Sequence, residues 1–228
     1  MGDKKQKEAM IKRTKQILVV GACVLFVVLM ILSGMGSHWL TMFTVIKPGD
    51  AVVVDYTLND NNGNPILTSN QQILTQTAAK SKYIIYSKPL SIITGQNLTK
   101  SIYPVSIYTS SSGWTKEYAL FSIEYDAISQ ALVGMRAGDQ KRIRIPNISM
   151  TQDWSAAQLT SNGVNIEDIK LGDILTMGVS DNPELNASNT TITYTRMGQV
   201  TRKTNESVIV DFGYPSADIS IVSINAKS

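Results

Sequence analysis

Side chains that commonly act as nucleophiles, general bases or metal ligands are scarce in this chain of 228 residues. It contains one cysteine, Cys23, and one histidine, His38. One thiol forms no intramolecular disulfide, and one Cys with one His cannot build a Cys/His zinc site. A Ser-His-Asp triad would depend on His38, at the edge of an apolar segment. We therefore expect no metal, no cofactor and no covalent catalysis.

Charged side chains are distributed unevenly. Residues 1–16 carry six Lys or Arg and two acids, whereas the rest of the chain carries 15 basic and 16 acidic residues. No acid occurs between Asp60 and Glu117, so that stretch offers no carboxylate for acid/base catalysis. A basic tail on a near-neutral body differs from the basic face of a nucleic-acid-binding protein. We expect no nucleic-acid partner.

Residues 17–36, ILVVGACVLFVVLMILSGMG, form an uncharged apolar segment of 20 residues. As a helix it would span about 30 Å, the thickness of a bilayer's hydrocarbon core. The basic tail before it places residues 1–16 in the cytoplasm and the following domain outside the cell membrane. A cleaved signal peptide is the alternative, but its apolar core has only about 7–15 residues. We predict a single-pass anchor that contacts membrane lipid, with Cys23 as a small apolar filler.

Five Asn-x-Ser/Thr motifs support an extracytoplasmic position for the domain, since this motif accepts N-linked glycans. The motifs begin at Asn97, Asn147, Asn186, Asn189 and Asn205.

The elements beyond the anchor are mostly strands. Residues 51–58 (AVVVDYTL) are β-branched and lead into the Asn62-Gly63 turn, which predicts a hairpin with residues 65–69. Residues 126–135 have apolar side chains at helical spacing and predict one packed helix. Further strands are predicted at 140–145, 191–199, 207–212 and 219–224, and a weak helix at 154–159. Residues 70–116 contain short strand-like runs with polar breaks, and their tyrosines are interpreted as sheet packing.

Three stretches, in the right order, resemble a known family. They are GDAVVVDYTLNDNNGNPILTS, then ISQALVGMRAGDQKRIRIP, then VNIEDIKLGDIL with GQVTRKTNESVIVDFGYPSADISIVSIN. Together they resemble the FKBP-type peptidyl-prolyl cis-trans isomerases, in the long SlyD-like form that carries an inserted chaperone domain. The resemblance covers roughly two-thirds of the part beyond the anchor and leaves out residues 70–116.

The resemblance implies an α+β fold. A transmembrane helix would precede a mostly antiparallel β FKBP-like domain with one packed helix and an inserted small β-rich domain. The implied divisions are a tail at 1–16, an anchor at 17–36, an FKBP-like domain at 47–154 plus 207–228 with an atypical insertion at 70–116, and an inserted chaperone-like domain at 155–206.

The resemblance also implies an apolar pocket that holds a proline ring, without metal or covalent chemistry. The matching pocket residues are Tyr56, Ile66, Leu67, Tyr118, Tyr125, Ile128 and Ile221, with Ile219 as the alternative to Ile221.

The sequence departs from the family pattern at several pocket positions. Leu67 falls where most active members have an aspartate. Glu124 and Tyr125 fall where the family has an aliphatic pair. The tyrosine of the family's flap is missing, with Thr151 nearest to its place.

Rotation about an X–Pro bond has a barrier of about 20 kcal/mol, and an apolar pocket that favours the twisted amide lowers it. The first hypothesis is therefore an isomerase and folding chaperone for proline-containing or unfolded extracytoplasmic polypeptides. The alternative is a catalytically degenerate FKBP-like module that acts as a holdase or docks on a membrane complex. A pilin-like surface subunit is a weaker third hypothesis, because the chain has no internal repeat.

Overall fold

The structure is a computed structural model that describes residues 15, 17–31, 44–80, 82–146, 150–180 and 194–225. The chain divides into two compact units, Met1–Phe43 and Thr44–Ser228, and each is considered by itself. Some of the sequence-based predictions lie outside the described residues. These concern residues 1–14 and 32–36, His38, and the glycosylation motifs at Asn147, Asn186 and Asn189.

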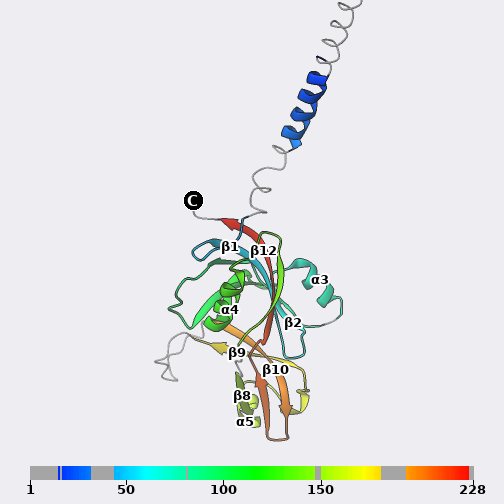
Figure 1. The fold of residues 1–228 in the computed structure, drawn as a ribbon. Helices are drawn as coiled ribbons and strands as arrows, with labels where there is room; N and C mark the ends of the chain where they lie inside the picture. Colours follow the sequence, from blue (N-terminus) through cyan, green and yellow to red (C-terminus); the bar gives the residue numbers. More distant parts are fainter. Residues whose placement is uncertain are drawn as a thin grey trace, which may run out of the picture. The chain divides into compact units, whose positions relative to one another are not determined.

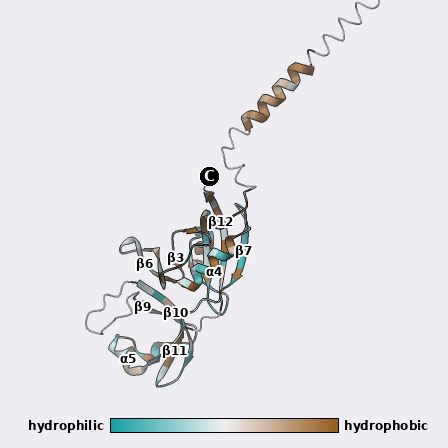
Figure 2. Ribbon diagram, turned by 60° about the vertical axis from the view of Figure 1, so that its left-hand side comes forward, coloured by the Kyte–Doolittle hydropathy of each residue, from teal (hydrophilic) through white to brown (hydrophobic). Residues whose placement is uncertain are grey.

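Residues 17–31 of the first unit form one helix, coloured blue in Figure 1 and hydrophobic along its length in Figure 2. Its large apolar side chains are between 47% and 73% exposed. Among the described residues, no helix combines the length and the apolar character needed to cross a membrane.

The second unit contains two six-stranded sheets. The first has the strand order β3-β2-β1-β12-β7, with β4 also paired to β1. Its strands are β1 (Ala51–Asn59), β2 (Pro65–Thr68), β3 (Ile85–Tyr86), β4 (Leu90–Ile93), β7 (Gln140–Arg144) and β12 (Ser216–Asn225). The predicted opening hairpin is confirmed, because β1 and β2 pair antiparallel across the 60–64 turn. β12 pairs with the other edge of β1, which sets Ile219 beside Tyr56.

The second sheet has the order β5-β6-β10-β11-β8, with β9 also paired to β10. Its strands are β5 (Ile102–Thr109), β6 (Gly113–Phe121), β8 (Thr151–Ser155), β9 (Ile174–Val179), β10 (Tyr194–Lys203) and β11 (Ser207–Asp211). Pairing is mostly antiparallel, and the parallel pairs are β2 with β3 and β6 with β10. The predicted α+β class is confirmed.

Three α-helices and one 3-10 helix complete the second unit's described part: α3 (Gln71–Ala78), α4 (Ser122–Leu132), α5 (Ala156–Ser161) and η1 (Ile166–Asp168). The helix predicted at 126–135 is α4, which begins and ends earlier. Its start is fixed by Glu124, whose Oε2 accepts a hydrogen bond from the Phe121 backbone N–H at 3.0 Å.

Helix α3 was not predicted. Its eight-residue sequence QQILTQTA has no charged residue, and five of its residues are polar. The Asn70 side chain starts the helix by accepting hydrogen bonds from the backbone N–H groups of Gln72 and Ile73.

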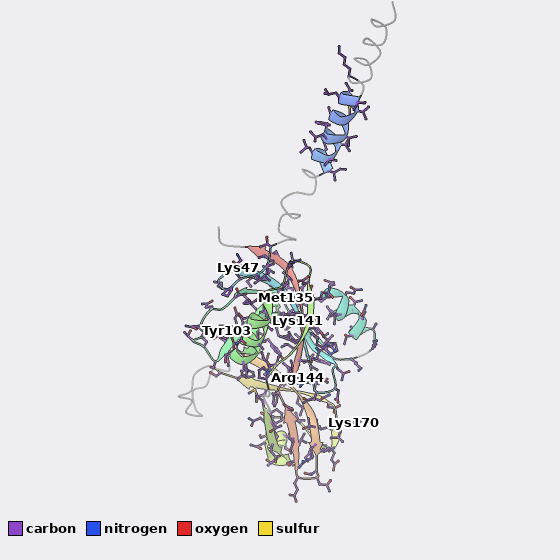
Figure 3. The ribbon with its side chains drawn as sticks, viewed as in Figure 1. Lys47, Tyr103, Met135, Lys141, Arg144 and Lys170 are labelled. Atoms are coloured by element: carbon purple, nitrogen blue, oxygen red, sulfur yellow. The ribbon has the colours of Figure 1, made fainter. Side chains whose placement is uncertain are left out.

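Two hydrophobic cores lie in the second unit. The larger gathers α4 and strands from both sheets. The smaller contains residues of α5, β10 and β11 and draws on positions from Met150 to Phe212, which extends on both sides beyond the predicted insertion at 155–206. We call this region, residues 150–180 and 194–212, the inserted unit. It lies at the opposite end from Lys47, the residue shortly before β1, as the positions of Lys47 and Lys170 in Figure 3 indicate.

Candidate functional site

The seven predicted pocket residues come together in the larger core. Six of them are at most 3% exposed, namely Tyr56, Ile66, Leu67, Tyr118, Ile128 and Ile221. Tyr125 is half-buried and stacks on Tyr103, with 4.4 Å between the ring centroids. The six residues are therefore almost fully covered by other side chains. Two of them still border open space, because Tyr56 is among the residues that line a cavity of about 350 Å³ and Ile66 is among those that line a crevice of about 490 Å³.

A buried ion pair between β10 and α4 lies in the same region as the predicted pocket residues. Arg196 of β10 and Glu124 of α4 both have fully buried side chains, and their charged groups are in direct contact. The α4 positions 124, 128 and 132 follow one another at helical spacing, so Glu124 shares the inward face of α4 with Ile128 and Leu132. Glu124 therefore places a charged group on the buried face of α4, beside the predicted pocket residue Ile128.

All five N–H groups of the Arg196 guanidinium have acceptors. Nε and Nη2 donate to the Phe212 carbonyl at 3.0 and 2.8 Å, and Nη1 donates to the Ala119 carbonyl at 2.9 Å. Nη1 also donates to Glu124 Oε2 at 2.9 Å, and Nη2 donates to Glu124 Oε1. A buried charge is tolerated when it is paired and fully hydrogen-bonded, and Arg196 meets both conditions.

Aromatic rings enclose the same guanidinium. Its central carbon lies 3.9 Å from the ring centroid of Tyr214, 4.6 Å from that of Phe121 and 5.9 Å from that of Tyr118. The hydroxyls of Tyr118 and Tyr214 are hydrogen-bonded to each other, and the Tyr214 hydroxyl donates to the Met197 carbonyl at 2.7 Å. We call Arg196, Glu124, Phe121, Tyr118 and Tyr214 the buried cluster.

The electrostatics of the buried cluster favour fixed protonation states. Burial raises the pKa of Tyr118 and of Tyr214 above the usual value for tyrosine. Burial opposes the charge of Arg196, but contact with Glu124 and the tyrosine hydroxyls keeps its pKa above the usual range. No tyrosine of the cluster titrates near neutral pH, so these groups are unsuited to acid/base catalysis there.

Sequence reasoning missed Arg196, Phe121 and Tyr214. The one available signal for Arg196 was its position in β10. Alternate residues of a strand face the same side, and Arg196 therefore shares the buried side of β10 with Gly198 and Val200. An arginine in that phase is usually interpreted as a strand-end or surface residue, so the signal was weak.

A groove of about 500 Å³ lies in the inserted unit, between α5 and β9. Trp154, Leu159 and Val164 line one side, and Leu175 and Met177 of β9 line the other. The groove rests on the smaller hydrophobic core, to which all five of these residues contribute. The groove is therefore a mainly apolar surface with a packed floor, and its lining also includes the polar residues Gln158, Ser161, Asn162 and Thr176.

The β9 strand also offers backbone groups. Among the described strands it pairs with β10 alone, and no other described strand covers its second edge. An extended polypeptide can add to such an edge and place alternate side chains on the apolar floor.

A crevice of about 490 Å³ separates the opening hairpin from β9, and Ile66, Tyr83 and Ile174 are among its lining residues. Two side-chain hydrogen bonds connect the hairpin turn to β10 and β11 near this crevice. Asn61 donates to Asp211 at 2.8 Å, and Asn62 donates to Gln199 at 3.1 Å. Of the predicted pocket residues, Ile66 reaches this crevice, but with little exposed surface.

Within the described residues, no group of three His, Cys, Asp or Glu side chains is arranged to hold a metal ion. No family model matches the chain, and a search of curated proteins also finds no match.

Proposed function

We propose that the chain is a membrane-tethered, FKBP-like binding module that holds unfolded or proline-containing polypeptides. The apolar groove between α5 and β9 is the observation that carries this proposal. It combines a packed apolar floor with an edge of β9 that no other described strand covers, and these two features can recognise an extended chain without regard to its detailed sequence.

The arrangement of elements supports the resemblance to the FKBP family. The opening hairpin, the helix α4 and the last strand β12 all contribute to one core, as that resemblance implies. A separate small β-rich unit interrupts the chain between β7 and β12, where the long form carries its insertion.

The burial of the predicted pocket favours holding over catalysis. An isomerase must place the prolyl ring against its pocket residues, and six of the seven candidates are covered in this structure. Isomerase activity therefore stays a prediction. We expect the wild-type chain to accelerate prolyl cis-trans exchange only slightly. The substitution of Leu67 for the family aspartate points in the same direction.

Tethering to the membrane is proposed from the apolar segment at 17–36 and from the basic tail before it. The described helix at 17–31 has apolar side chains exposed on all sides, which suits a lipid environment and would be costly in water. In the second unit the inserted unit lies at the opposite end from Lys47 (Figure 3), so the groove is remote from the point where the chain enters the domain.

The groove is tested with the full-length chain in detergent or lipid nanodiscs. Met177→Glu and Val164→Glu each place a charge on the apolar floor, and we expect either change to weaken suppression of the aggregation of an unfolded client at least tenfold. Leu171→Glu is the matched control, because Leu171 is 68% exposed in the same unit and does not line the groove. Equal suppression by all three variants and by the wild type would remove the groove as the holding surface.

Catalysis is measured separately by NMR exchange on a short prolyl peptide. A wild-type rate close to the uncatalysed one is expected. A large acceleration that persists in Met177→Glu would replace the holding function with that of an isomerase.

A further inference from the structure

We propose that a cavity on the outer face of the first sheet binds a small zwitterion, namely a dipeptide with a free amino group and a free carboxylate. The cavity measures about 350 Å³, and residues of β1, β12, β7 and the start of α3 line it. We call it the outer cavity. Its lining shares no residue with the groove between α5 and β9, so the inference goes beyond the proposed function.

The outer cavity opens on the side of the sheet that faces away from the larger core. Successive residues of a strand point to opposite sides, and Tyr56 and Ile219 belong to the larger core. The residues next to them, Asp55 on β1 and Asp218 and Ser220 on β12, therefore lie on the outer face. Pairing sets Asp55 beside Ser220, and β7 pairs with the other edge of β12. The outer face is thus a polar surface built from three neighbouring strands.

One of the two carboxylates on this face is compensated. Asp218 accepts hydrogen bonds from Arg142 Nε and Nη2 at 2.6 and 2.8 Å, and from the Asn59 side chain at 3.0 Å. The hydrogen bond from Arg142 is also the main reason why the pKa of Asp218 lies below its usual value. Asp218 therefore stays ionised, and its charge is neutralised within the protein.

The other carboxylate keeps an oxygen for a ligand. Asp55 Oδ1 accepts a hydrogen bond from the Ser69 hydroxyl at 2.8 Å, whereas no donor among the described residues bonds to its Oδ2. Neither ion pair of the described residues includes Asp55. The Ser69 bond fixes the carboxylate at the cavity, and an ammonium group of a ligand would supply the missing positive partner.

The opposite charge comes from β7. Lys141 lines the outer cavity and, like Asp55, takes part in neither ion pair of the described residues. Arg142 also lines the cavity, and its Nη1 is not used by Asp218. A ligand carboxylate can therefore bind at the β7 side while its ammonium binds Asp55. A ligand with only one of these charges would leave Asp55 or Lys141 without a partner.

The spacing of the two charges suits a dipeptide. Strand β12 separates β1 from β7, so the backbones that carry Asp55 and Lys141 lie about 10 Å apart. Their side chains cover part of this distance, and an extended dipeptide spans about 7 Å. Ile73 of α3 offers an apolar contact for an aliphatic side chain, and Gln140 offers an amide for the peptide group. The volume is near the lower end of the range of about 300–1,000 Å³ for small-molecule sites.

The test uses the full-length chain in detergent and the dipeptide Ala-Leu, with binding followed by NMR titration. We expect saturable binding at millimolar peptide. Asp55→Asn keeps an acceptor for Ser69 but removes the charge, and Lys141→Gln removes the other charge. Each should weaken binding at least tenfold, because each deletes a charged partner of the ligand. Lys170→Gln is the matched control, since Lys170 is exposed in the inserted unit and does not line the outer cavity.

Blocked peptides test the same charges without changing the protein. N-acetyl-Ala-Leu lacks the ammonium and Ala-Leu-amide lacks the carboxylate, so each should bind the wild type at least tenfold more weakly than Ala-Leu. The acetylated peptide should bind the wild type and Asp55→Asn equally weakly. Free leucine is the last arm. Weaker binding than that of Ala-Leu is expected, and equal binding would assign the outer cavity to single amino acids and overturn the dipeptide.

Three further results would show that the outer cavity is not a zwitterion site. These are no saturation by Ala-Leu at millimolar concentration, equal binding of the free and the blocked peptides, and equal binding by Asp55→Asn, Lys141→Gln and the control. Met177→Glu separates this inference from the proposed function. It changes the groove alone, so it should leave the binding of Ala-Leu intact whether or not the groove holds clients.

Discussion

Arg196 places a charged group in the interior of the second unit, where its side chain has no exposed surface. Burying one charge without a partner would cost several kcal/mol, and the desolvation of two is repaid only when their geometry satisfies every donor. Arg196 reaches this condition with Glu124 and two backbone carbonyls. Removal of one partner would therefore leave an uncompensated buried charge, whereas replacement of both partners would not.

Breaking the pair on one side only should be costly. Glu124→Ala leaves the guanidinium buried without its counter-ion, and we expect the free energy of unfolding to fall by about 3–5 kcal/mol. Arg196→Met with Glu124→Leu should cost much less, because no charge is left unpaired. Urea unfolding of both variants measures this difference, and equal losses would contradict the assigned role of the pair.

Tyr56 gives a prediction with a defined pH dependence. Its hydroxyl is buried near Ser87 Oγ, and neither oxygen completes a hydrogen bond within the described residues. At pH 7, Tyr56→Phe should therefore change the free energy of unfolding by less than about 1 kcal/mol.

Above pH 10 the free energies of unfolding of the wild type and of Tyr56→Phe should change differently with pH. Burial raises the pKa of Tyr56, so the folded state keeps a proton that the unfolded state loses near pH 10. The stabilising contribution of the protonated hydroxyl is present below pH 10 and is lost as the pH rises further, by up to about 1.4 kcal/mol per pH unit. Urea unfolding between pH 9 and 11 should show a steeper loss for the wild type than for Tyr56→Phe. Parallel curves would contradict the burial of the hydroxyl.

Strand β10 is the element on which the second unit depends. It pairs with β9, β11 and β6, carries Arg196 into the larger core and places Val200 in the smaller one. At Gly198 the strand passes so close to Phe212 that a Cβ atom would lie 2.6 Å from the ring.

Gly198→Ala should therefore strain the contact between β10 and the chain after β11. We expect a loss of about 1–3 kcal/mol from overpacking, seen as a lower melting temperature. Arg202→Ala changes an exposed position of the same strand and serves as the control. A melting temperature of Gly198→Ala equal to that of this control would show that Phe212 moves aside without cost.

At the scale of the whole molecule, the inserted unit is connected to the rest of the second unit by the chain and also by the ion pair between Arg196 and Glu124. Deleting residues 155–206 removes Arg196 and leaves Glu124 buried and unpaired. We expect this deletion variant to lose cooperative unfolding, and Glu124→Leu in the same variant to restore part of it. Thermal unfolding followed by circular dichroism compares the two, and a stable deletion variant with Glu124 intact would contradict the coupling.

The hairpin, the helix α4 and the strands β7, β10, β11 and β12 were predictable from sequence because each has a strong local signal. Alternating apolar residues, an Asn-Gly turn and helical spacing act over a few residues. Helix α3 was not predictable in this way, since it depends on one capping side chain, Asn70, and not on a periodic pattern.

By itself, the sequence determined that this chain holds one cysteine and one histidine, that an uncharged apolar segment follows a basic tail, and that the part beyond this segment contains an opening hairpin and a packed helix. Only the tertiary structure decided that Arg196 and Glu124 form a buried ion pair beside residues that were predicted to line an apolar pocket. The physical reason is that Arg196, on strand β10, lies 72 residues from Glu124, on helix α4. Local patterns carry no information about which distant side chain will pair with a buried charge.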